Sequence, residues 1–169
     1  VIGAPMTAND LREMMTLAKD YDGPIAIRYP RGRTNESDRQ WATDNGLWEM
    51  GKGICLRESE EAKVAILSLG AIGHTVKEAI DLLGNEHKVA HYDMRWLKPM
   101  DDQLLHEIGK RFTKIITVED GVISGGLGSA VLEFMADNGY TPYVIRLGVN
   151  DQFVEHGSTE ELYHLLKLD

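Results

Sequence analysis

Residues 63–94 read KVAILSLGAIGHTVKEAIDLLGNEHKVAHYDM. Residues 63–69 are almost continuously apolar, which is typical of a strand that is buried on both faces of a parallel sheet. Residues 75–83 carry apolar side chains at helical spacing, and Gly84 supplies a common helix stop signal. Residues 88–94 return to a strand pattern. The segment therefore predicts a strand, a helix and a second strand.

The same alternation continues on both sides of this segment. Further strands are predicted at 51–57, 114–118 and 143–147, and further helices at about 101–112 and 126–138 and after the N-cap Ser158. Strands that alternate with helices are typical of parallel sheets, because each crossover returns the chain to the same sheet edge. The pattern predicts an α/β fold: an open, mostly parallel twisted sheet with helices on both faces.

The first 31 residues form a separate strand–helix–strand pattern. Residues 1–4 and 25–29 read as strands, and Thr7 with Asp10 three residues later is a capping signal for the helix between them. Residues 32–47 are polar and without period, which is typical of a linker. We therefore expect three parts, which are a partial unit at 1–31, a linker at 32–47 and a domain at 48–169.

Composition excludes several classes of partner. The 169 residues include 27 acidic and 18 basic side chains, a net charge of −9, and an acidic surface repels nucleic acid. No apolar run approaches the roughly 18 residues that span a membrane. Cys55 is the single cysteine, so no internal disulfide is possible, and a cytoplasmic location is expected.

Three glycine-rich, polar loops follow predicted strands, at 70–74, 95–99 and 119–128. Ligands of open α/β sheets bind beyond the carboxyl ends of the strands, so these loops could form a ligand site, a docking surface for another domain, or plain connections. Two of them lead into helix N-termini, which attract anions, but neither contains a phosphate-loop motif. The six histidines show no zinc-ligand spacing.

Arg28 and Arg31 flank Tyr29 and Pro30 at the end of a predicted strand. A guanidinium group is a planar fork of donors that suits a phosphate group. These two arginines are therefore candidate phosphate-binding residues, and the alternative is a pair of solvated side chains beside the linker.

Several short motifs occur in a characteristic order. They are GPIAIRYPRG (23–32), GKG (51–53), DMRWLKPMD (93–101), VEDG (118–121), GGLGSA (125–130) and FVEHGS (153–158). This set resembles the deoxyxylulose-phosphate synthases, a thiamine-diphosphate-dependent family of the transketolase superfamily, over essentially the whole chain. The beta chains of 2-oxo-acid dehydrogenases share RYPR and the arginine–proline–aspartate loop, so they remain an alternative, as does a stand-alone α/β binding module.

The resemblance implies a reaction and a domain assignment. The family condenses pyruvate with glyceraldehyde 3-phosphate, with loss of CO2, to form 1-deoxy-D-xylulose 5-phosphate, a precursor of isoprenoids, thiamine and pyridoxal. Its homodimers hold thiamine diphosphate and Mg²⁺. Residues 1–31 then correspond to the end of the pyrimidine-binding domain and residues 48–169 to the transketolase C-terminal domain. Arg31 matches the arginine that binds the substrate phosphate, and Arg28 is a weaker candidate, structural or interfacial.

The resemblance also implies what this chain lacks. The family's Gly-Asp-Gly cofactor motif with its asparagine does not occur, and the chain begins at Val1 without a methionine. We therefore expect a C-terminal fragment that binds neither thiamine diphosphate nor a metal ion and is inactive alone. Its expected partners are the rest of its own chain and a second subunit, which its C-terminal domain would help to dock.

Overall fold

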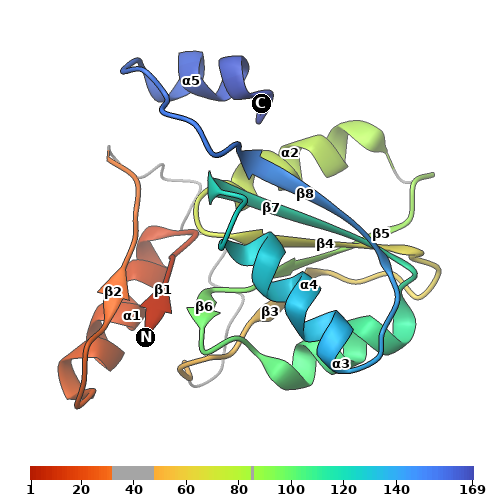
Figure 1. Cartoon of the computed structure of the whole chain (residues 1–169), viewed down its shortest axis with the longest axis horizontal. Coiled ribbons are helices and arrows are strands. Elements are labelled where there is room, and N and C mark those ends of the chain that lie inside the picture. The colour runs from red at the N-terminus through yellow and green to blue at the C-terminus, as the bar shows by residue number, and fades with distance from the viewer. Residues whose placement is uncertain (32–47, 85) are drawn as a thin grey trace.

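The computed structural model describes residues 1–31, 48–84 and 86–169 and contains two sheets (Figure 1). The predicted linker, residues 32–47, lies outside the described residues. The strand–helix alternation is present in the order expected from the sequence.

The larger sheet has the strand order β3-β5-β4-β7-β8. Its strands are β3 (Ile54–Arg57), β4 (Val64–Leu69), β5 (Val89–Asp93), β7 (Lys114–Val122) and β8 (Tyr143–Val149). Strands β5, β4, β7 and β8 are parallel to one another, and only β3, at one edge, is antiparallel to its neighbour β5. The predicted open, mostly parallel sheet is confirmed.

Helices cover both faces of this sheet. Helices α3 (Asp102–Arg111) and α4 (Leu127–Asp137) contribute to one apolar cluster, and α2 (Gly73–Leu83) and α5 (Thr159–Leu166) contribute to the other. Neighbouring residues of β4 belong to different clusters, Ile66 to the second and Leu67 to the first. This two-sided burial explains the continuous apolar run in the sequence.

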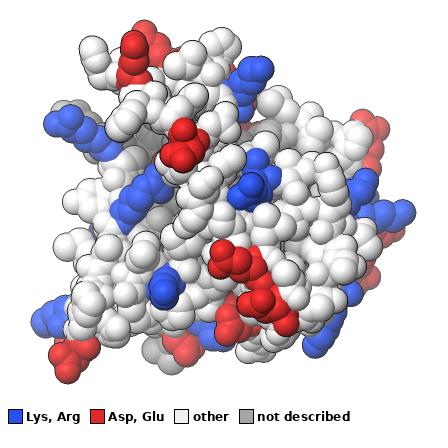
Figure 2. Space-filling view, viewed as in Figure 1, with Lys and Arg blue, Asp and Glu red and all other residues white. Residues whose placement is uncertain are grey.

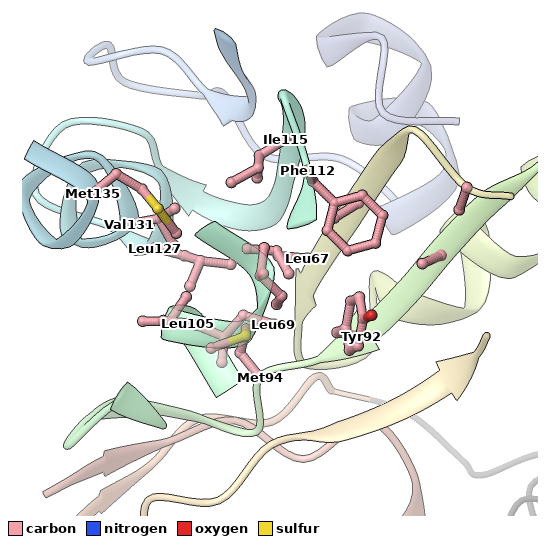
Figure 3. Close-up of a cluster of buried hydrophobic side chains, with 14 of the residues drawn as sticks. Leu67, Leu69, Tyr92, Met94, Leu105, Phe112, Ile115, Leu127, Val131 and Met135 are labelled. Atoms are coloured by element: carbon pink, nitrogen blue, oxygen red, sulfur yellow. The ribbon is translucent and has the colours of Figure 1, made fainter. Parts of the chain in front are cut away.

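The first cluster is the main core (Figure 3). Leu67 of β4 points toward side chains from α3 and α4, and several of these side chains are completely shielded from solvent. Residues with no more than 2% exposure here include Leu67, Met94, Leu105, Ile108, Ile115, Leu127, Val131 and Met135. Burying an aliphatic side chain of this size stabilises the fold by about 1.5–3 kcal/mol, so this cluster holds the two helices on the sheet.

The smaller sheet joins the N-terminal unit to the rest of the chain. Its order is β2-β1-β6, with β1 (Ile2–Gly3) parallel to β2 (Ala26–Ile27) and antiparallel to β6 (Trp96–Lys98). Helix α1 (Ala8–Asp20) connects β1 to β2. The sequence predicted a loop where strand β6 lies. The strand forms through pairing with β1, whose residues are more than ninety positions away, so it has no local sequence signal.

Helix caps follow the sequence signals closely. The Thr7 hydroxyl accepts from Asp10 N at 3.1 Å and the Asp10 carboxylate accepts from Thr7 N at 2.8 Å, which completes the predicted capping box. Ser158 and Glu161 form a second capping box, and Asp101 is the N-cap of α3. Strand β7 is longer than expected: it continues through Val122, which pairs with Val149 of β8.

Candidate functional site at the carboxyl edge of the sheet

The N-terminal unit covers the carboxyl ends of β4 and β5. The Ala4 amide donates to the carbonyl of Arg95 at 2.9 Å, and the Met6 carbonyl oxygen lies 3.0 Å from Nε2 of His74. Gly3 lies against the ring of Trp96, so closely that a Cβ atom would come within 2.8 Å of it. These contacts favour the docking-surface interpretation of the loops at 70–74 and 95–99.

Arg95 is a central contact of this docking surface. Its guanidinium group is buried, lies 3.7 Å from the ring centroid of Trp48 and is 4.0 Å from the carboxylate of Asp10 on α1. Its backbone has φ of 55°, a left-handed conformation that costs a non-glycine residue about 1–2 kcal/mol. The sequence pattern placed residue 95 in a connecting loop and gave no sign of this role.

The glycine-rich N-terminus of α4 is occupied by the protein's own carboxylate. The two oxygens of the buried Glu119 accept from Leu127 N and Gly128 N, each at 2.9 Å. A Cβ atom on Gly126 would lie 2.1 Å from the same carboxylate, so this position requires glycine. The anion-binding potential of this helix end is therefore satisfied internally.

Arg28 is bound to the end of β7. Its Nη2 donates to the carboxylate of Asp120 and, at 2.9 Å, to the Asp120 carbonyl. The hydroxyl of Tyr163, on α5, donates to the other carboxylate oxygen of Asp120 at 3.3 Å. Burial and the charge of Asp120 raise the pKa of Tyr163 to about 12, so the hydroxyl stays protonated and donates at neutral pH.

A small pocket of about 40 Å³ lies beside this ion pair. It is lined by Ala4, Arg28, Tyr29, Pro30, Gly70, Ala71 and Asp120. The pocket has room for roughly one water molecule and too little for a phosphorylated sugar.

Arg31 differs from Arg28 in its surroundings. It is exposed, and within residues 1–31, 48–84 and 86–169 it forms no ion pair. Of the two candidate phosphate-binding arginines, Arg28 has one guanidinium nitrogen, Nη2, bound to Asp120, whereas Arg31 has no ion-pair partner among the described residues. The assignment of both residues to a substrate site stays a prediction.

A buried row of polar side chains crosses β4 and β5. The Ser68 hydroxyl lies 2.9 Å from Nε2 of His91, and the Asp93 carboxylate accepts from Arg95 N at 3.0 Å. Burial lowers the pKa of His91 to about 4, and burial, with the charge of Asp10 adding to it, raises the pKa of Asp93 to about 7. These side chains are at most 1% exposed, which makes the row structural rather than a nucleophilic site.

This row predicts opposite pH dependences for two variants. The contribution of His91 to the stability of the fold decreases as pH falls from its ordinary pKa of 6.5 towards 4. The contribution of Asp93 decreases as pH rises from its ordinary pKa of 3.8 towards 7. The two effects cancel between pH 4 and 6.5 in the wild type. With Asp93→Asn, the free energy of unfolding should rise with pH there, and with His91→Gln it should fall, each by up to about 1.4 kcal/mol per pH unit.

Urea unfolding at pH 4.5, 5.5 and 6.5 measures these slopes. Asp81→Asn, at an exposed carboxylate on α2, is the control and should reproduce the wild-type slope. Slopes of the same sign in the Asp93 and His91 variants would contradict the opposite contributions of these two residues to the pH dependence of stability.

The two glycine-rich helix starts that the sequence offered for an anion are both occupied by other described residues. The N-terminus of α4 holds the Glu119 carboxylate, and Ala4 and Met6 lie against Gly70, Gly73 and His74 at the start of α2. In the described part of the chain, no three His, Cys, Asp or Glu side chains are grouped as metal ligands. None of the helices described there is long and apolar enough to cross a bilayer.

Charged side chains on the face shown in Figure 2 are scattered in small groups of both signs. No extended basic patch appears on that face of the described residues. A nucleic-acid footprint would require clustered Lys and Arg side chains, so this face offers none.

The profile of the family described as "Transketolase, C-terminal domain" matches residues 52–169. The chain belongs to this family. Curated relatives named 1-deoxy-D-xylulose-5-phosphate synthase are 52% identical in Parabacteroides distasonis and 48% identical in Phocaeicola vulgatus, each over 100% of this chain. The resemblance to these synthases is thereby confirmed. The chain spans 26% and 27% of the length of the two relatives.

Two solved structures are similar to this chain. The first is described as "Split gene transketolase, inactive beta4 tetramer" and superimposes with a TM-score of 0.82 at 29% identity, over 99% of this chain and 53% of that one. The second is a transketolase from Campylobacter jejuni, with a TM-score of 0.68 at 16% identity over 99% of this chain and 24% of that one. The second likeness concerns the fold alone.

Proposed function

We propose that this chain is the C-terminal quarter of a 1-deoxy-D-xylulose-5-phosphate synthase. The whole enzyme would condense pyruvate with glyceraldehyde 3-phosphate and release CO2. The observation that carries the proposal is the 52% identity to a curated synthase over the entire chain. In this assignment residues 1–31 end the pyrimidine-binding domain, residues 32–47 are the linker, and residues 48–169 are the C-terminal domain.

The chain's own contribution would be to bind and orient the phosphorylated substrate. Thiamine diphosphate, held with Mg²⁺ elsewhere in a dimeric enzyme, supplies the carbanion chemistry when bound. The guanidinium fork of Arg31 would bind the phosphate group of glyceraldehyde 3-phosphate and so place its aldehyde for reaction. The domain at 48–169 would support the arginine turn through the contacts of the N-terminal unit.

The isolated 169-residue chain should not bind the cofactor. Isothermal calorimetry with thiamine diphosphate and Mg²⁺ is expected to give no saturable heat, because the glycine-rich end of α4 is occupied by Glu119. The full-length polypeptide provides the positive control. Stoichiometric binding by the isolated chain at micromolar concentration would contradict this expectation.

The choice of acceptor tests the proposed function directly. The full-length enzyme, supplied with pyruvate, should transfer the two-carbon unit to glyceraldehyde 3-phosphate and leave a lipoyl domain unmodified. Mass spectrometry of the sugar phosphate and of the lipoyl domain measures both products in one reaction. Transfer to the lipoyl domain alone would replace the proposal with the dehydrogenase beta chain.

A further inference from the structure

We infer that Asp120 and Tyr163 are positioning residues for the phosphate-binding Arg31, acting through Arg28. The inference rests on the proposed function and extends it to a specific task for the C-terminal domain. In Figure 1 the chain after β2 runs upward along the left of the molecule, the arrowhead of β7 points toward that side, and α5 lies above both. Arg28, which directly follows β2, and Tyr163 of α5 both contact the carboxylate of Asp120 in β7.

Arg28 is fixed at both its backbone and its side chain. Its amide donates to the carbonyl of Gly3 at 2.9 Å, which continues the pairing of β2 with β1. Its guanidinium group donates to both the carbonyl and the carboxylate of Asp120. The residue therefore connects the N-terminal unit to the carboxyl end of β7, ninety-two positions later in the sequence.

The position of Arg31 follows from that of Arg28. Only Tyr29 and Pro30 separate the two arginines, so their Cα atoms are at most about 10 Å apart. Proline fixes its own φ and restricts the residue before it to extended conformations, so the turn has few alternative shapes. Anchoring Arg28 consequently limits the directions in which the Arg31 side chain can point.

Asp120 is itself held in place from the C-terminal side. It lies in β7, its carboxylate accepts from the Tyr163 hydroxyl, and its side chain is only 20% exposed. The Tyr163 ring packs against the apolar cluster that contains Ile72, Val76 and Leu168. The position of α5 on the sheet therefore fixes the Asp120 carboxylate, and this carboxylate in turn holds Arg28 at the start of the arginine turn.

The ion pair also makes the two arginines of the turn electrostatically different from each other. Arg28 is neutralised by Asp120, so an incoming phosphate group would meet Arg31 as the uncompensated guanidinium of this pair of arginines. If Asp120 were removed, Arg28 would be released and would offer a competing fork. The phosphate group would then have two alternative positions, and the aldehyde would no longer be held in one orientation.

Asp120→Ala in the full-length enzyme tests this inference. The KM for glyceraldehyde 3-phosphate should rise about tenfold, while the KM for pyruvate should change by less than about twofold. With unphosphorylated D-glyceraldehyde as the acceptor, the variant and the wild type should be equally active. Tyr163→Phe, which removes one hydroxyl and preserves the apolar packing, should raise the KM for glyceraldehyde 3-phosphate about two- to threefold.

Asp81→Ala is the matched control, because Asp81 also forms ion pairs but lies on α2, away from the arginine turn. It should leave both KM values unchanged. A double-mutant cycle then separates positioning from general stabilisation: in an Arg31→Ala background, Asp120→Ala should not raise the KM for the phosphorylated substrate any further, and the released Arg28 would lower it if it changes at all.

The outcomes distinguish the inference from the proposed function. Additive effects of the two substitutions, or equal losses with phosphorylated and unphosphorylated acceptors, would overturn the positioning role of Asp120 and leave the proposed function standing. A wild-type full-length enzyme that forms no ketose phosphate from the two substrates would overturn the proposed function itself.

Discussion

Arg31→Ala in the full-length enzyme is expected to raise the KM for glyceraldehyde 3-phosphate by about 10- to 100-fold and to leave the KM for pyruvate within about twofold. The substitution removes a charge-assisted, two-donor contact to a phosphate group, which is worth about 1.5–3 kcal/mol. Arg31 is exposed and forms no ion pair with the described residues, so its loss leaves no buried group unsatisfied.

Two further arginine variants are measured beside Arg31→Ala, one as a control and one as a test of the ion pair. Arg12→Ala, on the exposed side of α1, should change neither KM. Arg28→Ala should reproduce the smaller effect of Asp120→Ala, because Arg28 acts through the same ion pair. Steady-state kinetics with each substrate varied in turn gives all of these values, and equal effects of Arg31→Ala on both substrates would remove Arg31 from the phosphate site.

Glu119→Ala should lower the free energy of unfolding of the chain by about 2–4 kcal/mol. The substitution leaves the amides of Leu127 and Gly128 without their acceptor in a buried position and removes a negative charge from the positive end of α4. It also leaves an empty volume where the Glu119 carboxylate lies against Gly126. Urea unfolding followed by circular dichroism measures the change.

The comparison with a milder and a remote variant isolates the role of the carboxylate. Glu119→Gln keeps one acceptor oxygen but turns an amide donor toward the second N–H, so its loss should be intermediate. Glu58→Ala, which breaks the pair with Arg111 and removes the acceptor of the Tyr92 hydroxyl, should cost about 1–2 kcal/mol. If Glu119→Ala were no more costly than Glu58→Ala, the internal capping of α4 would not be a significant source of stability.

The large sheet could be predicted from the sequence because its signals are local. The apolar run at residues 63–69 lies in a strand with helices packed on both sides, so nearly every residue faces an apolar neighbour. The capping boxes at Thr7 and Ser158 act within four residues, and both occur where the sequence indicates. The mostly parallel topology follows from the regular alternation of these elements.

The contacts at the carboxyl edge could not be predicted in the same way. The pairing of Arg28 with Asp120, the docking of Ala4 on Arg95 and strand β6 all join residues about ninety positions apart. The sequence placed Glu119 in a polar loop. That its carboxylate caps the first turn of α4 depends on β7 continuing beyond residue 118. Such contacts carry no periodic signal, because each depends on how two separate units meet.

The buried row of Ser68, His91 and Asp93 illustrates a different limit. In the sequence these residues are polar interruptions in apolar strands, and the pattern alone does not distinguish buried from solvent-facing positions. The structure shows all three to be inaccessible to solvent, and burial is the largest cause of the shifted pKa values of His91 and Asp93. The alternation of strands and helices therefore predicted the sheet, but it did not predict that three polar side chains are buried within it.

The most direct test of the proposed role is a product assay on two polypeptides at equal concentration. Pyruvate, glyceraldehyde 3-phosphate, thiamine diphosphate and Mg²⁺ are supplied to the 169-residue chain and to the full-length polypeptide, and 1-deoxy-D-xylulose 5-phosphate is measured by mass spectrometry. We expect one product per CO2 released by the full-length polypeptide and none from the isolated chain. Product formation by the isolated chain, or its absence from the full-length polypeptide, would contradict the proposal.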